Sequence, residues 1–130
     1  MVKKLQAFAA ILVSWFALDA LGHGLAFASW YAASSEVWRP RNEMKVGVIY
    51  TGVAITAATF VAIYSKLIAK KCRRTGLWYG LAFGVANGSS YAFGGYAVHP
   101  IPVELAVGWF VLCVIEAVVA GLIVSTFVRD

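Results

Sequence analysis

The sequence between Val103 and Phe127 decides the fold class: VELAVGWFVLCVIEAVVAGLIVSTF. Beyond its first turn this stretch carries a single charged residue, Glu116, among valine, leucine, isoleucine and alanine. A helix of about 20 mostly apolar residues crosses the roughly 30 Å hydrocarbon core of a bilayer. The stretch therefore predicts a membrane-spanning helix.

Three further segments are apolar and long enough to cross a bilayer: about Leu5–Phe27, Val46–Lys66 and Gly76–Val98. The composition agrees, because 62% of the 130 residues are hydrophobic and only 13% are charged, whereas a soluble domain carries roughly a quarter charged residues. We therefore expect one all-α domain over 1–130, a four-helix transmembrane bundle. Its connections are an outer loop at 28–45, a basic loop at 67–75 and a tight turn before Val103.

Lysine and arginine are unevenly shared between the two ends of the expected helices. Those on the side of the N-terminus are Lys3, Lys4, Lys66, Lys70, Lys71, Arg73, Arg74 and Arg129, and those opposite are Arg39, Arg41 and Lys45. Such an excess marks the cytoplasmic side. We therefore expect both termini in the cytoplasm and a multi-pass protein of the bacterial inner membrane. The net charge of +5 then reflects topology, and no nucleic-acid partner is expected.

The segment at 76–98 carries a small residue at every fourth position: Gly76, Gly80, Gly84, Gly88 and Ala92. Such a glycine zipper lets two helices approach closely in a membrane, where apolar side chains alone give little reason to associate. Two outcomes stay open. The row packs inside the bundle, or it docks another subunit and makes the protein a homo-oligomer or part of a larger complex.

Three polar residues are expected near the middle of the membrane. At a rise of 1.5 Å per residue, Glu116, Asn87 and Thr56 each lie roughly 15–17 Å from the N-terminal side. A charge at that depth is costly. We therefore expect Glu116 to be protonated, with Asn87 and Thr56 as its available partners.

A second group of polar residues is expected nearer the outer face. Asp19 and His23 are four residues apart on the first helix, so they share a face. Others at or beyond this depth are Ser90, Tyr91, His99 and Glu104. Three interpretations remain. The group fixes helix packing, it relays protons or binds a cation, or His23, His99, Asp19 and Glu104 hold a metal ion.

No catalytic motif is found, and no cofactor other than that metal is expected. Gly76-Leu77-Trp78-Tyr79-Gly80 lacks the strand and the Gly-Lys-Ser/Thr of a phosphate loop, and two histidines are too few for a two-haem cytochrome. Cys72 and Cys113 are expected at very different depths, so they do not form a disulfide. We therefore expect a protein that is not an enzyme.

The chain resembles the small four-helix inner-membrane families of bacteria to which no function is assigned. The likeness rests on Leu18-Asp19-Ala20-Leu21-Gly22, an aromatic loop with arginines, a glycine- and tyrosine-rich third helix, Pro100 to Pro102, and Glu104 to Trp109. It implies the bundle architecture, and no substrate, cofactor or catalytic residue.

The expected function is that of a non-enzymatic membrane component, either self-associating or an accessory subunit of a membrane complex. The main alternative is a small transporter or proton-coupled carrier that uses Asp19, His23 and Glu116. A further alternative is a metal-binding protein of the outer side. In every case the bilayer is the surrounding partner.

Overall fold

The computed structural model describes residues Met1–Arg129, and Asp130 lies outside the described part. Four long helices make up most of it: α1 (Val2–Leu21), α3 (Val46–Leu67), α4 (Arg73–Val98) and α5 (Val103–Phe127). Shorter helical pieces are a π-turn (Gly22–Ala26), α2 (Ala28–Ala33) and two 3-10 turns (Ser35–Val37 and Arg41–Glu43). No strand occurs in Met1–Arg129. The predicted all-α class is confirmed.

Three stretches of this structure are long and apolar enough to cross a membrane: Val2–Ala26, Val46–Leu67 and Val103–Phe127. The protein thus has the helices of a membrane protein. α4 is not among the three, although it is the longest helix with 26 residues. The reason is its composition, because glycine, serine, asparagine and tyrosine replace the aliphatic residues that fill α5. The apolarity of α4 alone therefore does not identify it as a fourth membrane-spanning helix.

The first helix differs from the continuous one expected at 5–27. The α-helix ends at Leu21, the chain continues through the π-turn, and Phe27 breaks the helical path with φ −99° and ψ 4°. α2 then begins at Ala28, inside the stretch expected to be a loop. Glycines at 22 and 24 weaken the preference for a regular helix at this point.

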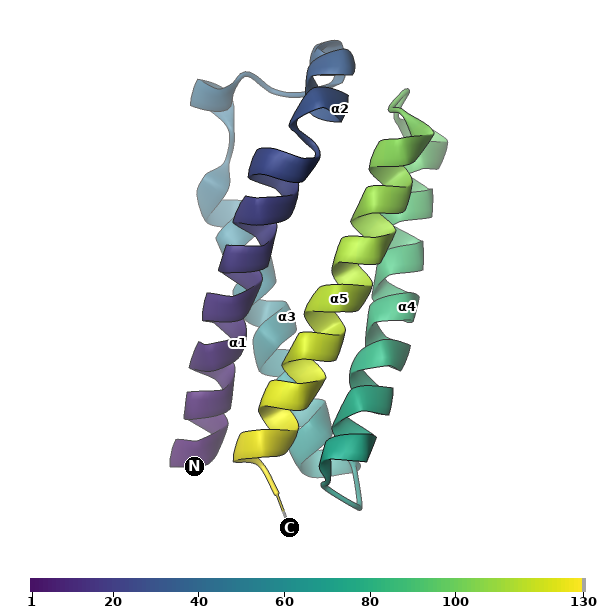
Figure 1. Cartoon of the computed structure of the whole chain (residues 1–130). Coiled ribbons are helices and arrows are strands. Elements are labelled where there is room, and N and C mark those ends of the chain that lie inside the picture. The colour runs from purple at the N-terminus through teal and green to yellow at the C-terminus, as the bar shows by residue number, and fades with distance from the viewer. Residues whose placement is uncertain (130) are drawn as a thin grey trace.

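The four long helices lie side by side, and the N-terminus and the C-terminal end of α5 lie at the same end of the bundle (Figure 1). We call this the terminal end, and the opposite end, which holds α2 and the turn between α4 and α5, the far end. α5 packs against both α4 and α1, and α3 packs against α1. The closest of these pairings is that of α4 with α5.

The glycine row of α4 lies against α5. All its members are buried: Gly76, Gly80, Gly84, Gly88 and Ala92. A Cβ atom added to Gly84 would lie 2.8 Å from Cα of Val114 and 2.9 Å from Cβ of Ala117, so the two backbones nearly touch. At Gly76 the added atom would meet the carbonyl oxygen of Gly121, itself a glycine. The row is therefore used within the chain, which is the first of its two expected outcomes.

Aromatic rings join α3 to α4 near the terminal end. We call Phe60, Tyr64, Tyr79 and Phe83 the aromatic layer. The Phe60 ring lies 4.4 Å from that of Tyr79 and 5.0 Å from that of Phe83, and the Tyr79 hydroxyl donates to the Phe60 carbonyl at 2.9 Å. Toward the far end the residues of α3 from 46 to 52 are all exposed. The helices α3 and α4 are thus held together near one end only.

Candidate functional site

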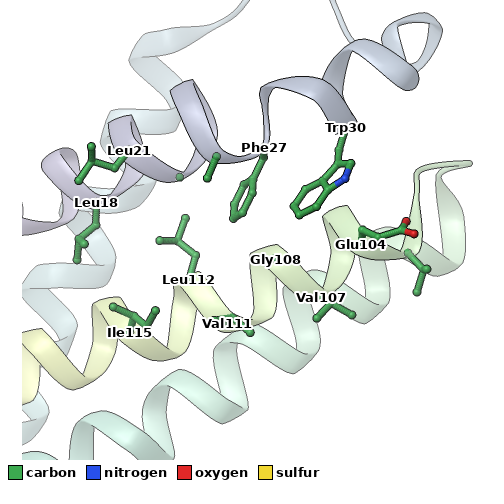
Figure 2. A pocket seen from close by; sticks show the side chains of 13 residues that line it. Leu18, Leu21, Phe27, Trp30, Glu104, Val107, Gly108, Val111, Leu112 and Ile115 are labelled. Atoms are coloured by element: carbon green, nitrogen blue, oxygen red, sulfur yellow. The ribbon is translucent and has the colours of Figure 1, made fainter.

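The segment that follows α1 is fixed closely to α5. A Cβ atom on Gly22 would lie 2.6 Å from a methyl group of Leu112, and one on Gly108 would lie 2.8 Å from the Phe27 ring. Figure 2 shows the side chains of Phe27 and Leu112 in the space between the two segments. The π-turn lies between these contacts and carries His23. Single π-turns inside α-helices occur often at functional sites.

His23, Tyr31 and Trp109 form a hydrogen-bonded series. The indole N–H of Trp109 donates to the Tyr31 hydroxyl at 2.8 Å, and that hydroxyl lies 2.5 Å from Nδ1 of His23. An indole nitrogen can only donate. The Tyr31 oxygen therefore accepts from Trp109, which leaves its own hydrogen free to point at Nδ1 of His23. The proton of a neutral His23 is then on Nε2, the nitrogen that faces Asp19.

Tyr31 keeps its proton at neutral pH. Burial raises the pKa of its phenol well above the usual range, and the hydrogen bond from Trp109 opposes this only in part. The hydroxyl is thus available as a donor to His23 over the whole physiological range.

Asp19 continues the series from His23 toward the middle of α5. Its Oδ1 lies 3.6 Å from Nε2 of His23, and the two side chains are 34% and 35% exposed. This distance permits an ion pair but exceeds that of a direct hydrogen bond. The spacing of four residues along the chain places the two groups on one face, as the sequence predicts.

Glu116 meets Asp19. The two carboxyl groups are close enough to interact, and the indole N–H of Trp15 donates to the Glu116 backbone carbonyl at 2.8 Å. A hydrogen bond between two carboxyl groups requires one proton between them, because a carboxylate can only accept. Oε1 of Glu116 is buried and has no hydrogen-bond partner within Met1–Arg129. We call the series Trp109–Tyr31–His23–Asp19–Glu116 the polar chain.

The expectation that Asn87 and Thr56 are the partners of Glu116 is wrong. The Thr56 hydroxyl donates to the carbonyl of Gly52 in its own helix at 2.9 Å, and Asn87 is exposed. The rotation of α5 explains the difference, because the glycine row takes Ala117 toward α4. Glu116, one residue earlier and about 100° around the helix, then points to α1.

Of the remaining polar residues expected near the far end, only Tyr91 packs against a member of the polar chain. The Tyr91 ring packs 5.0 Å from that of Trp109 and is 52% exposed. Ser90 is exposed. His99 stacks on Trp38 with ring centres 6.4 Å apart, and its Nδ1 lies 3.1 Å from the Gly95 carbonyl.

The four residues considered as metal ligands do not converge. Asp19 and His23 are paired, while His99 stacks on Trp38 and Glu104 borders the groove between α5 and the segment from α1 to α2. Within the described chain, no group of three or more histidine, cysteine, aspartate or glutamate side chains could hold one metal ion.

Tyr31 and Trp109 were not singled out from the sequence as members of the site. Tyrosine and tryptophan are common at membrane interfaces, so Tyr31 in a connecting segment carries no distinctive signal, and Trp109 lies among the apolar residues of its helix. The one available signal was that tryptophan, when buried, needs an acceptor for its N–H, and Trp109 is only 4% exposed.

Comparison of the chain with protein-family models, with curated proteins and with solved structures gives no match. Function is therefore argued from the geometry of the polar chain.

Proposed function

We propose that this protein carries protons across a membrane, as a small proton-coupled carrier. The observation that supports this most strongly is the polar chain. In it a pair of neighbouring carboxyl groups lies beside a histidine whose two nitrogens contact different titratable groups. Groups that gain and lose protons in such a series are the usual material of proton relays in membranes.

Proton movement along the polar chain follows the order of its contacts. His23 takes a proton on Nδ1 from Tyr31 and releases the one on Nε2 to Asp19, while Tyr31 regains a proton from water. Asp19 passes this proton on to Glu116, and Glu116 releases one proton toward the terminal end, so that the pair returns to its starting state. The exposure of about a third of Asp19 and His23 supports access from the far end, and the aromatic layer lies between α3 and α4 on the other side.

The topology proposed with this function is that of four spans in the bacterial inner membrane, with both termini in the cytoplasm. The distribution of lysine and arginine supports the orientation. The length of α4 and its close packing along α5 support a fourth span, because helix pairs with small residues at the contact are common in membranes.

Proton entry into reconstituted vesicles tests the proposal. The protein is placed in liposomes with a pH-sensitive dye inside, and a potassium diffusion potential drives protons inward. We expect Glu116→Gln and Asp19→Asn to slow proton entry by about tenfold or more, because an amide cannot pass on a proton. Glu104→Gln is the matched control, since it removes a carboxylate outside the polar chain. The proposal fails if wild-type vesicles match empty ones, or if all three variants behave alike.

A second candidate is the self-associating or accessory role expected from the sequence. The glycine row no longer supports it, but Asn87 and Ser90 on α4 do, because both are exposed and polar side chains facing lipid are unfavourable. If a second copy covers this face, Asn87→Leu should shift the protein in mild detergent from oligomer to monomer. Purification of the wild type as a monomer, without a co-purifying protein, would argue against this role.

A further inference from the structure

We propose that the groove between α5 and the segment from α1 to α2 binds one acyl chain of a phospholipid with a primary ammonium headgroup, of the phosphatidylethanolamine type. The groove has a volume of about 630 Å³. Figure 2 shows its two walls, with Leu18, Leu21 and Phe27 on one side and Val107, Val111 and Ile115 on the other.

The length of the groove fits one leaflet of a bilayer. It follows α5 from Val103 to Ile115, which at 1.5 Å per residue is roughly 18 Å. Half of the hydrocarbon core measures about 15 Å. The groove therefore extends from the membrane surface at the far end to about the middle of the bilayer, as an acyl chain does.

The volume favours an acyl chain over a helix of another protein. A helix of about 10 Å diameter and this length occupies roughly 1,400 Å³, which is more than twice the volume of the groove. The groove cannot become deeper to admit a helix. At its floor Gly22 is already in contact with Leu112 of α5, and Gly108 is in contact with Phe27.

The far-end mouth of the groove supplies the headgroup preference. Glu104 is the one charged residue of the lining, and none of the residues Met1–Arg129 forms an ion pair with it. Figure 2 shows its carboxylate at the end of the groove near Trp30. A carboxylate accepts hydrogen bonds from a primary ammonium. It repels an anionic headgroup, and a trimethylated ammonium has no N–H to offer it.

The experiment is native mass spectrometry of the full chain. The protein in detergent is mixed with phosphatidylethanolamine, phosphatidylglycerol and phosphatidylcholine that have identical acyl chains, and the lipids that stay bound after release from detergent are measured. We expect one phosphatidylethanolamine to be retained about tenfold more than either other lipid, because a charge-assisted hydrogen bond raises the affinity by about that factor. Glu104→Gln should make retention of the three lipids equal. Val111→Trp fills the groove and should abolish retention of all three.

Val85→Trp on α4 is the matched control, because Val85 is 43% exposed and Val111 is 47% exposed. Val107→Trp is a second filling variant, in case Val111→Trp does not fold. Equal lipid retention by the filling and control variants would overturn the groove as the binding site. An unchanged preference in Glu104→Gln, or a preference for phosphatidylglycerol in the wild type, would overturn the assignment of the headgroup.

Discussion

Asp19 has two partners at once, the imidazole of His23 and the carboxyl group of Glu116. Asparagine in its place keeps the shape and the hydrogen bonding, so Asp19→Asn should melt within a few degrees of the wild type while proton entry is lost. Leucine leaves the half-buried Glu116 without its partner, and Asp19→Leu should cost about 1–3 kcal/mol of stability. Thermal melts in detergent measure both variants.

Ala20→Leu is the control for the added bulk, because Ala20 is exposed on the same helix. Equal destabilisation by Asn and by Leu at position 19 would mean that the negative charge itself holds the bundle together, and it would contradict this account.

The sequence was sufficient to predict that Asp19 and His23 share a face, because their spacing is local. It was not sufficient to pair Glu116 with Asp19 or Trp109 with Tyr31. Those contacts depend on the rotation of α5 about its axis, which the packing against α4 sets. Residues at equal depth, such as Glu116 and Asn87, can therefore face different neighbours.

Among the helix pairs, α4 and α5 pack most closely. Gly84→Leu would place a branched side chain where even a Cβ atom lies 2.8 Å from Val114, so we expect a loss of about 1–3 kcal/mol or more. Gly94→Leu is the matched control on the same helix, because nothing lies within 4 Å of an added Cβ there. If both variants melt at the same temperature, the row does not hold the two helices together.

The element types were predictable where the apolar pattern is long and uniform. The all-α class is confirmed, and so are three helices fit to cross a membrane. The π-turn and α2 were missed, because Gly22 to Phe27 is apolar enough to read as a continuous helix. α4 was predicted as a helix, but the role of its glycines becomes clear only from their packing against α5.

For the whole molecule, the orientation in the membrane is testable through Cys72 in the basic connection. A hydrogen bond with Thr75, at 3.2 Å from Sγ to Oγ1, lowers the pKa of the Cys72 thiol, so more thiolate is present at neutral pH. In Cys113→Ser, a membrane-impermeant maleimide should therefore label Cys72 quickly in inverted vesicles and not in intact cells. A protein with Cys72 and Cys113 replaced and Ser35→Cys added should show the reverse. Labelling of Cys72 in intact cells would invert the proposed topology.

The short turn at residues 99–102 has a consequence for how the chain enters a membrane during synthesis. α4 is less apolar than the three stretches fit to cross a membrane, and it packs closely against α5 along its glycine row. The two should therefore integrate together as one hairpin, after synthesis of α5, and not one after the other. A chain truncated after Val98, with a reporter enzyme fused at its end, should leave α4 on the cytoplasmic side, whereas a chain extended through α5 should carry it across.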